Sequence, residues 1–350
     1  MFHLELRPKA SKFMRYFTPV LAIFLTLLSG VFIFTLLGKS PLDVFQIFLV
    51  NPFKNTYALA ELFLKATPLM LIALGLTVSF QANVWNIGAE GQYIMGAVFA
   101  TFVALYLPIS SHFLMITLMV IAGVLGGMFW AAIPAFLKTK MHTNEILVSL
   151  MLVYVAQFFA SWLVYIPWQD PEGHGFPQTK IFDQVALLPI IFPDTRLNLA
   201  FVFALFFLVL GYILLFRSHL GFQLKVLGRA QLAARYAGFS THAMIWLGLL
   251  ISGAMAGLAG MAEVAGPAEQ LTEHISNRYG FAAIIVAFVG RLHPFGIFLA
   301  SLLMSVIYIG GEQAQQYLNL PSSIGMIFQG LLLLFLLSSD ILITYRVRFS

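Results

Sequence analysis

The chain has 350 residues, of which 60% are hydrophobic and 9% are charged, and its mean hydropathy is +0.91. A soluble domain needs more polar surface than this composition supplies, so the composition predicts an all-α polytopic membrane protein in contact with a lipid bilayer. The net charge of +5 does not indicate a nucleic-acid partner, because in a membrane protein the Lys and Arg residues report orientation instead.

Apolar segments recur along the whole chain, and most approach the ~20 residues that a helix needs to cross ~30 Å of hydrocarbon. They fall at about residues 17–37, 57–80, 87–107, 113–137, 144–166, 198–216, 243–262, 280–290, 295–311 and 321–343. We therefore expect about ten transmembrane helices in a single transmembrane domain over residues 1–350. The segment 280–290 is too short to span, and is predicted to be half of a broken helix or to begin earlier, within 267–279.

Basic residues set the expected orientation of these helices. With the N-terminus in the cytoplasm, ten crossings return the C-terminus there, and thirteen of the 19 Lys and Arg residues then lie on the inner side. The largest loops on this assignment are 167–197 outside and 217–242 inside. The sequence thus predicts a multi-pass protein with both termini in the cytoplasm.

A polar stretch interrupts the third apolar segment, where Asn83, Asn86, Glu90 and Gln92 occur within NVWNIGAEGQYIMGAV. If residues 83–90 are helical, the first three of these side chains lie within about 60° of one another and Gln92 points the other way. A carboxylate in the bilayer costs roughly 2.5–3.5 kcal/mol even on the lenient insertion scale, so Glu90 must face a cavity, a partner or a helix terminus.

Two interpretations of this polar stretch remain open and are compatible. In the first, the side chains line a translocation path. In the second, they hydrogen-bond a broken backbone around Gly88 and Gly91 and fix a re-entrant turn. Asn144 and Glu145 form a second polar pair, which is a further path candidate, although its simpler role is helix capping. There Thr143 or Asn144 is expected as N-cap, with Glu145 favoured by the helix dipole.

Small residues mark close helix packing at two places. Gly123 and Gly127 form a GxxxG pattern, and the stretch 252–260 presents small residues on several faces. In membrane helices such patterns allow two backbones to approach closely. We interpret both as packing surfaces and not as ligand sites.

The basic loop 217–242 also has two interpretations. It is either a retention signal that rests on anionic headgroups or a rigid docking element for a cytoplasmic partner. In the second case Phe222, Val226 and Leu227 are expected to share one face, with Lys225 and Arg229 exposed.

The second half of this loop carries its own helix signal. Residues 230–237 have good helix propensity, and Gly238 is expected at the C′ position that ends the helix.

Motifs for catalysis or metal binding are missing from the sequence. The triplet Gly38-Lys39-Ser40 fails as a P-loop, because Ile33 stands where the first glycine is required. The chain has no cysteine and its histidines are scattered, so no metal site or bound cofactor is expected. An intramembrane enzyme is disfavoured, because no paired catalytic groups occur in the apolar segments.

Several motifs together resemble a known family. The stretches NIGAEGQ, NEILVSLMLVYVA, LGFQLKVLGRAQLAARYAG, GLAGMAEVAG and GFAAIIVAFVGRLHPFG lie at residues 86–92, 144–156, 220–238, 257–266 and 280–296. They resemble the permease subunits of bacterial ABC importers for nucleosides and simple sugars, in the branched-chain amino acid/ribose permease superfamily. The matches extend from about residue 60 to 340 in the expected order.

The resemblance implies an architecture and a set of partners. The fold would be a ten-helix permease similar to that of the cobalamin importer, in the bacterial cytoplasmic (inner) membrane. The partners would be a second permease subunit, two cytoplasmic ABC ATPase subunits that use the ATP, and an extracytoplasmic substrate-binding protein.

The resemblance also assigns roles to residues. The segment 220–238 would couple to the ATPase, and Asn86, Glu90 and Gln92 would belong to a signature near the path. The coupling residues would be Gly221, Phe222, Lys225, Gly228, Arg229, Arg235 and Gly238.

This sequence departs from the family at a few positions, and these leave the substrate open. Ala230-Gln231 stands where Asn-Pro is common, and Val153 and Leu292 stand where Asn is frequent. A nucleoside or purine is the first expectation and a simple sugar the second. The alternative function is an ion- or proton-coupled secondary transporter that uses Glu90 and needs no ATPase.

Overall fold

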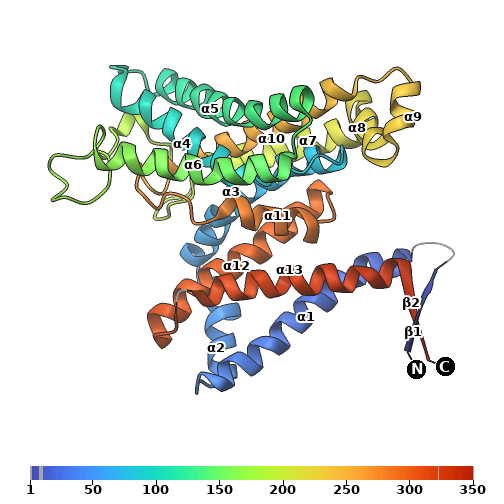
Figure 1. The fold of residues 1–350 in the computed structure, drawn as a ribbon. Helices are drawn as coiled ribbons and strands as arrows, with labels where there is room; N and C mark the ends of the chain where they lie inside the picture. Colours follow the sequence, from blue (N-terminus) through green and yellow to red (C-terminus); the bar gives the residue numbers. More distant parts are fainter. Residues whose placement is uncertain (1, 8–10, 322, 350) are drawn as a thin grey trace. The chain divides into compact units, whose positions relative to one another are not determined.

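The computed structural model describes residues 2–7, 11–321 and 323–349, and nearly all of its regular structure is helical (Figure 1). The α-helices are α1 (Lys12–Leu36), α2 (Pro41–Phe45), α3 (Thr56–Gln81), α4 (Ala89–Tyr106), α5 (His112–Met141), α6 (Glu145–Tyr165), α7 (Ala200–Arg217), α8 (His219–Arg229), α9 (Gln231–Tyr236), α10 (Thr241–Val264), α11 (Tyr279–Val289), α12 (Pro294–Leu318) and α13 (Ser323–Thr344). A short π-helix, η1 (Gln46–Val50), and two 3₁₀-helices, η2 (Asn51–Phe53) and η3 (Gln184–Ala186), occur between them. The predicted all-α class is confirmed.

Two strands were not predicted from the sequence. Strand β1 (Phe2–Leu6) pairs with strand β2 (Tyr345–Phe349) in an antiparallel ribbon, with Leu6 opposite Tyr345. The Arg346 guanidinium also pairs with the Glu5 carboxylate at 3.0 Å. This ribbon joins the two ends of the chain.

Each apolar segment expected from the sequence coincides with a helix. Within the described residues, eight helices are long and apolar enough to cross a membrane, namely α1, α3, α5, α6, α7, α10, α12 and α13. The expected segment 87–107 corresponds to α4, and 280–290 corresponds to the short apolar helix α11. The chain is therefore a multi-pass membrane protein, while the count of ten crossings stays a prediction.

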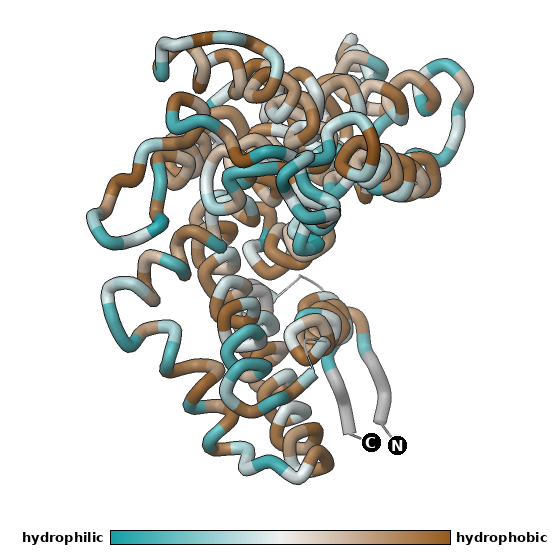
Figure 2. Tube along the Cα trace, turned by 90° about the vertical axis from the view of Figure 1, so that its left-hand side faces the viewer, coloured by the Kyte–Doolittle hydropathy of each residue, from teal (hydrophilic) through white to brown (hydrophobic). Residues whose placement is uncertain are grey.

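The outer faces of the helices are suited to lipid. On α6 the exposed side chains include Leu147, Met151, Phe158 and Trp162, which recur at helical spacing. Figure 2 shows hydrophobic residues running along the helices, with many of the hydrophilic residues in the connecting loops. Apolar surface of this extent is expected where lipid is the solvent.

The chain divides into two compact units, residues 1–62 with 303–350 and residues 63–302. In the first unit α1 packs along α13, where the Phe34 and Phe328 rings stack with centroids 5.5 Å apart. A polar contact lies in the same helix pair, because the Thr18 hydroxyl donates to Asp340 Oδ1 at 2.9 Å. The prediction of a single domain over the whole chain stays a prediction.

The second unit is built around the packing of α4, α5 and α10. A side chain on Gly127 would meet the Gly253 carbonyl, and one on Gly96 would meet the backbone of Gly257. The glycines thus let these three backbones approach to contact distance. Close packing predicted from the small-residue patterns is confirmed.

Candidate functional site

The polar stretch at residues 83–88 is a turn between two helices and not a helix. Helix α3 ends at Gln81, α4 begins at Ala89, and Asn83 adopts a left-handed backbone with φ of 56°. Asparagine tolerates that conformation, which ends the regular helix here. Asn83 is exposed, and its Oδ1 accepts a hydrogen bond from Trp85 Nε1 at 3.2 Å. The prediction that Asn83, Asn86 and Glu90 share a helical face is therefore wrong.

Asn86 is the centre of a buried amide network. Its Nδ2 donates to Gln92 Oε1 and to Ser252 Oγ, both at 2.8 Å, and its Oδ1 accepts from Gln92 Nε2 at 3.1 Å. The same Oδ1 accepts from the Gly88 amide at 3.1 Å. Gln92 therefore points toward Asn86, contrary to the prediction, because Asn86 precedes the helix. The network ties the start of α4 to α10.

Glu90 is fully buried and anchors a different helix. Its Oε2 accepts a hydrogen bond from the Gly280 amide at 2.6 Å, and its Oε1 accepts from the Ser276 hydroxyl. The carboxylate thus lies at the N-terminus of α11, where the helix dipole favours negative charge. A side chain on Gly280 would meet the Glu90 backbone, so the glycine permits this approach.

Asn144 and Glu145 hold the turn between α5 and α6. Asn144 Oδ1 accepts from the Ile146 amide at 2.9 Å, so the expected N-cap is confirmed for Asn144. Glu145 pairs with the Lys138 ammonium at the end of α5 and accepts from the Trp85 amide at 3.4 Å. The pair therefore connects the two helices to the turn that follows α3.

These contacts favour the second interpretation of the polar stretch. Asn86, Glu90, Gln92 and Glu145 are all buried, and each bonds to a turn or to a helix start. Buried polar groups of this kind are stable only when paired, and here the pairing fixes broken backbone within a helical protein. Their contact with a transported molecule stays a prediction.

Two short helices, α8 and α9, form the basic loop between α7 and α10 (Figure 1). A side chain on Gly221 would meet the Leu214 carbonyl of α7, and one on Gly228 would meet the Gln81 carbonyl at the end of α3. Both glycines therefore let α8 rest directly on the ends of two long helices. Gly238, with φ of 78°, follows α9 at the C′ position as predicted.

Lys225 lies on the inner side of α8, so the prediction that it is exposed is wrong. Its ammonium donates to the Leu215 carbonyl at 2.6 Å and lies 3.9 Å from the centre of the Phe216 ring. Burial lowers the pKa of Lys225, and the nearby charge of Arg229 lowers it further. The lysine caps the C-terminal end of α7 and attaches α8 to it.

The outward surface of α8 and α9 is partly apolar. Phe222 is 56% exposed and so does not share the buried face of Leu227, contrary to the prediction. Leu232 and Tyr236, which sequence reasoning missed, are 70% and 93% exposed. Their spacing of four residues in a short helix is the signal that marks a common face. We call Phe222, Arg229, Leu232, Arg235 and Tyr236 the coupling surface.

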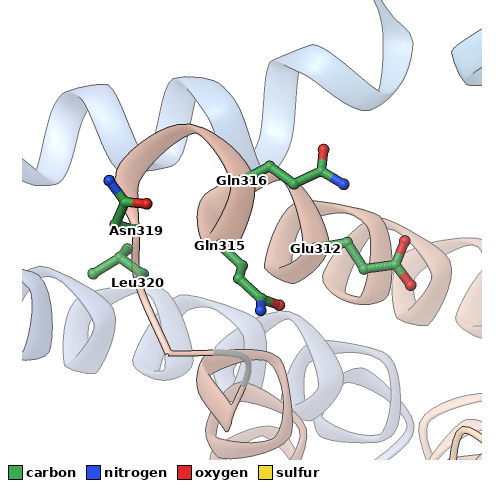
Figure 3. Close-up of a pocket in the computed structure, with 5 residues that line it drawn as sticks. All are labelled: Glu312, Gln315, Gln316, Asn319 and Leu320. Carbon is green, nitrogen blue, oxygen red and sulfur yellow. The ribbon is translucent and has the colours of Figure 1, made fainter.

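A polar cavity in the first unit was also missed from the sequence. Figure 3 shows Glu312, Gln315 and Gln316 on the last turns of α12 and Asn319 and Leu320 just beyond them. The cavity has a volume of about 590 Å³. Positions 312, 315, 316 and 319 follow the helical spacing, so a polar stripe on an otherwise apolar helix is the signal that identifies it.

Comparison with known proteins finds similarity to transport permeases in every case described below. A family model described as "Branched-chain amino acid transport system / permease component" matches residues 58–337. The chain is 34% identical to a glucose ABC transporter permease protein of Haloferax volcanii, over 98% of this chain and 93% of the relative. It is 30% identical to a guanosine ABC transporter permease protein of Bacillus subtilis, over 95% and 94% of the two chains. A nucleoside ABC transporter permease protein of Lactococcus lactis is 29% identical over 86% and 85%.

Proposed function

Because this chain belongs to the branched-chain amino acid transport system / permease component family, we propose that it imports a nucleoside, a purine or a simple sugar as the membrane subunit of an ATP-driven transporter. The family match over residues 58–337 carries this proposal. The relatives named for glucose, guanosine and nucleosides align over most of both chains, which supports the substrate class.

The ATP is used by a separate subunit, and this chain binds no cofactor of its own. Two cytoplasmic ATPase subunits, a second permease subunit and an extracytoplasmic binding protein complete the transporter. The protein resides in the bacterial cytoplasmic membrane with both termini inside, as the bias of its basic residues supports.

The coupling surface is where the ATPase docks. Phe222, Leu232 and Tyr236 offer apolar area to a partner, and Arg229 and Arg235 offer positive charge. Aromatic and Arg side chains are the types that dominate binding energy at interfaces. An exposed patch of this kind on a cytoplasmic loop supports a protein partner over simple contact with headgroups.

The attachment of α8 explains how motion at this surface reaches the membrane helices. Gly221 and Lys225 fix α8 to the end of α7, and Gly228 rests on the end of α3. A displacement of the ATPase therefore moves two long helices and not only a flexible loop. ATP binding shifts the inward–outward equilibrium if the two states contact the ATPase differently.

The polar cavity at the end of α12 suits an uncharged, hydroxylated substrate. Amide groups of Gln315, Gln316 and Asn319 donate and accept hydrogen bonds, and the Glu312 carboxylate accepts them. Sugars and nucleosides present hydroxyl groups that need both kinds of partner. A volume of about 590 Å³ lies within the range of small-molecule sites, roughly 300–1,000 Å³.

The ion-coupled alternative is less well supported. Both carboxylate oxygens of Glu90 already bond to Ser276 and Gly280, which is the arrangement of an anchoring group. The family relatives are ABC transporter permeases, which depend on a partner ATPase.

The test is uptake into vesicles that contain the complex. The permease is purified with its ATPase and binding protein, the ligand of the binding protein is identified, and uptake of that ligand is measured. Uptake must require ATP and be unaffected by collapse of ion gradients. Uptake that proceeds without ATP under a proton or sodium gradient contradicts the proposal and favours the secondary transporter.

A further inference from the structure

A second cavity, of about 210 Å³, opens between the end of α5, helix α9 and the start of α10. Its polar lining is formed by Lys138, Thr139, His142, Thr143, Gln231, Arg235, Thr241 and His242. Among the described residues that line it, none is acidic, and Glu145, which pairs with Lys138, lies outside the lining. Glu145 compensates the charge of Lys138, so Arg235 supplies the net positive charge of the lining.

Two hydroxyl groups in this lining have unused hydrogen-bonding capacity. Thr143 Oγ1 and Thr241 Oγ1 are buried and have no hydrogen-bond partner among the described residues. Thr241 is only 7% exposed, so its hydroxyl cannot be satisfied by bulk solvent. Native proteins rarely leave such groups unpaired, and an unpaired hydroxyl in a cavity wall is suited to a bound ligand.

The helix geometry adds to the positive character of the site. Thr241 is the first residue of α10, a helix of 24 residues whose N-terminal end carries partial positive charge. Ser240 caps this end, because its hydroxyl oxygen accepts a hydrogen bond from the Ala243 amide at 3.3 Å. The end of α5 contributes the opposite partial charge, which Lys138 in its last turn offsets. A helix N-terminus beside an Arg and buried hydroxyls is a typical arrangement for binding an oxyanion.

We infer that this cavity binds a phosphate group, held by the charge of Arg235 and by the hydroxyls of Thr143 and Thr241. A volume of about 210 Å³ is below the ~300–1,000 Å³ of drug-sized ligand sites, so it accommodates a phosphate or lipid headgroup and not a whole nucleotide. The bound group touches α5, α9 and α10 and so fixes α9 in place. This inference does not depend on the identity of the transported substrate, and Arg235 is the one residue that the cavity lining shares with the coupling surface.

The test uses the purified full chain in uncharged detergent at constant ionic strength. Inorganic phosphate is titrated in one arm and phosphatidylglycerol in mixed micelles in the other, with thermal stability as the readout. The variants are Arg235→Gln, which removes the charge, and Thr241→Val, which removes only the hydroxyl. Lys140→Gln is the matched control, because Lys140 is exposed beside the cavity without lining it.

We expect the ligand to stabilise the protein in a saturable way. The ligand concentration that gives half of this stabilisation should rise at least tenfold in Arg235→Gln and Thr241→Val and should be unchanged in Lys140→Gln. Thr241→Val without ligand should be as stable as the unaltered chain, because it loses no hydrogen bond among the described residues. Saturation by inorganic phosphate identifies a free phosphate, and saturation by the lipid alone identifies a headgroup.

If all three variants bind the phosphate or the lipid equally more weakly, the inference is overturned, because that result indicates only general charge attraction. Absence of saturable binding in both arms overturns it as well. In that case, a loss of ATPase association in Arg235→Gln would assign this arginine to a protein carboxylate.

Discussion

The backbone amide of Gly280 donates a hydrogen bond of 2.6 Å to the buried carboxylate of Glu90. These two residues lie 190 positions apart in the sequence, and their contact joins the start of α4 to the start of α11. A carboxylate that is costly in a bilayer thus stabilises the buried amide end of a short helix, whose first amides have no partner within the helix. The polar stretch at residues 83–98 therefore connects helices within the second unit.

Replacement of Glu90 should weaken the contact between α4 and α11. Glu90→Ala leaves the Gly280 amide and the Ser276 hydroxyl without their acceptor, so we expect a loss of about 1–3 kcal/mol in the free energy of unfolding. Glu90→Gln retains one acceptor and should lose less. Thermal unfolding in detergent measures both, and equal stability of Glu90→Ala and the unaltered chain would show that the contact contributes nothing.

Transport by Glu90→Gln distinguishes the two proposed functions. We expect uptake to continue, to require ATP and to be insensitive to a pH gradient. A secondary transporter that carries protons on Glu90 would instead lose uptake in this variant. Uptake into vesicles with an imposed pH gradient, with and without internal ATP, decides between these outcomes.

The coupling surface should be sensitive to acidic substitutions. Tyr236→Asp and Leu232→Asp remove interface anchors, and a loss of about 2 kcal/mol per anchor corresponds to roughly 30-fold weaker association with the ATPase. Phe176→Asp is the control, because Phe176 is 67% exposed in the loop predicted to lie outside. Co-purification and uptake measure the effect. Equal loss in the control, or full activity of Tyr236→Asp, would place the docking surface elsewhere.

A single methyl group should disturb the packing of α5 against α10. A side chain on Gly257 would meet the Gly123 carbonyl, so Gly257→Ala should cost about 1–3 kcal/mol by overpacking. On α13, the position where a side chain on Gly330 would begin has no described atom within 4 Å apart from its chain neighbours and the backbone of its own helix. Gly330→Ala should therefore be neutral or stabilising by up to about 1 kcal/mol. Thermal unfolding of the two variants tests this difference.

His293 should make stability depend on pH. It precedes α12, its Nδ1 accepts from the Phe295 amide at 3.3 Å, and its ring lies 4.9 Å from that of Phe216. Burial lowers the pKa of His293, and the Lys225 charge lowers it further. The folded protein therefore resists protonation more than the unfolded chain does. The contribution of neutral His293 to the free energy of unfolding should be fully present above the pKa of histidine in the unfolded chain, about 6.5. It should decline as the pH falls toward the lower pKa of His293 in the folded protein.

His293→Asn provides the comparison. Asparagine keeps a side-chain acceptor before the helix but does not titrate, so the decline between pH 7.5 and 5.5 should become smaller. Unfolding midpoints of both proteins across this range measure it. An identical decline in the variant would assign the pH dependence to other groups.

Patterns local in sequence predicted much of the fold. Each apolar segment became a helix, Asn144 caps α6, and Gly238 ends α9, because these depend on hydropathy and on a few neighbouring residues. The glycine pattern at 252–260 likewise predicted close packing.

The errors concern contacts that only the tertiary fold creates. A helical period applied to residues 83–90 misplaced Asn83 and Gln92, because the left-handed Asn83 ends regular structure there. Lys225 appeared exposed by spacing alone, but its partner is the Leu215 carbonyl at the end of the preceding helix. The acceptor role of Glu90 toward Gly280 has no local signal at all.

The ribbon between β1 and β2 has a topological consequence. Strands that exchange backbone hydrogen bonds lie on the same side of the bilayer, and here they are the first and last elements of the chain. The segment between the two strands therefore crosses the membrane an even number of times. Any proposed topology must keep this number even. If one helix is found not to cross the membrane, a second helix must also be found not to cross it.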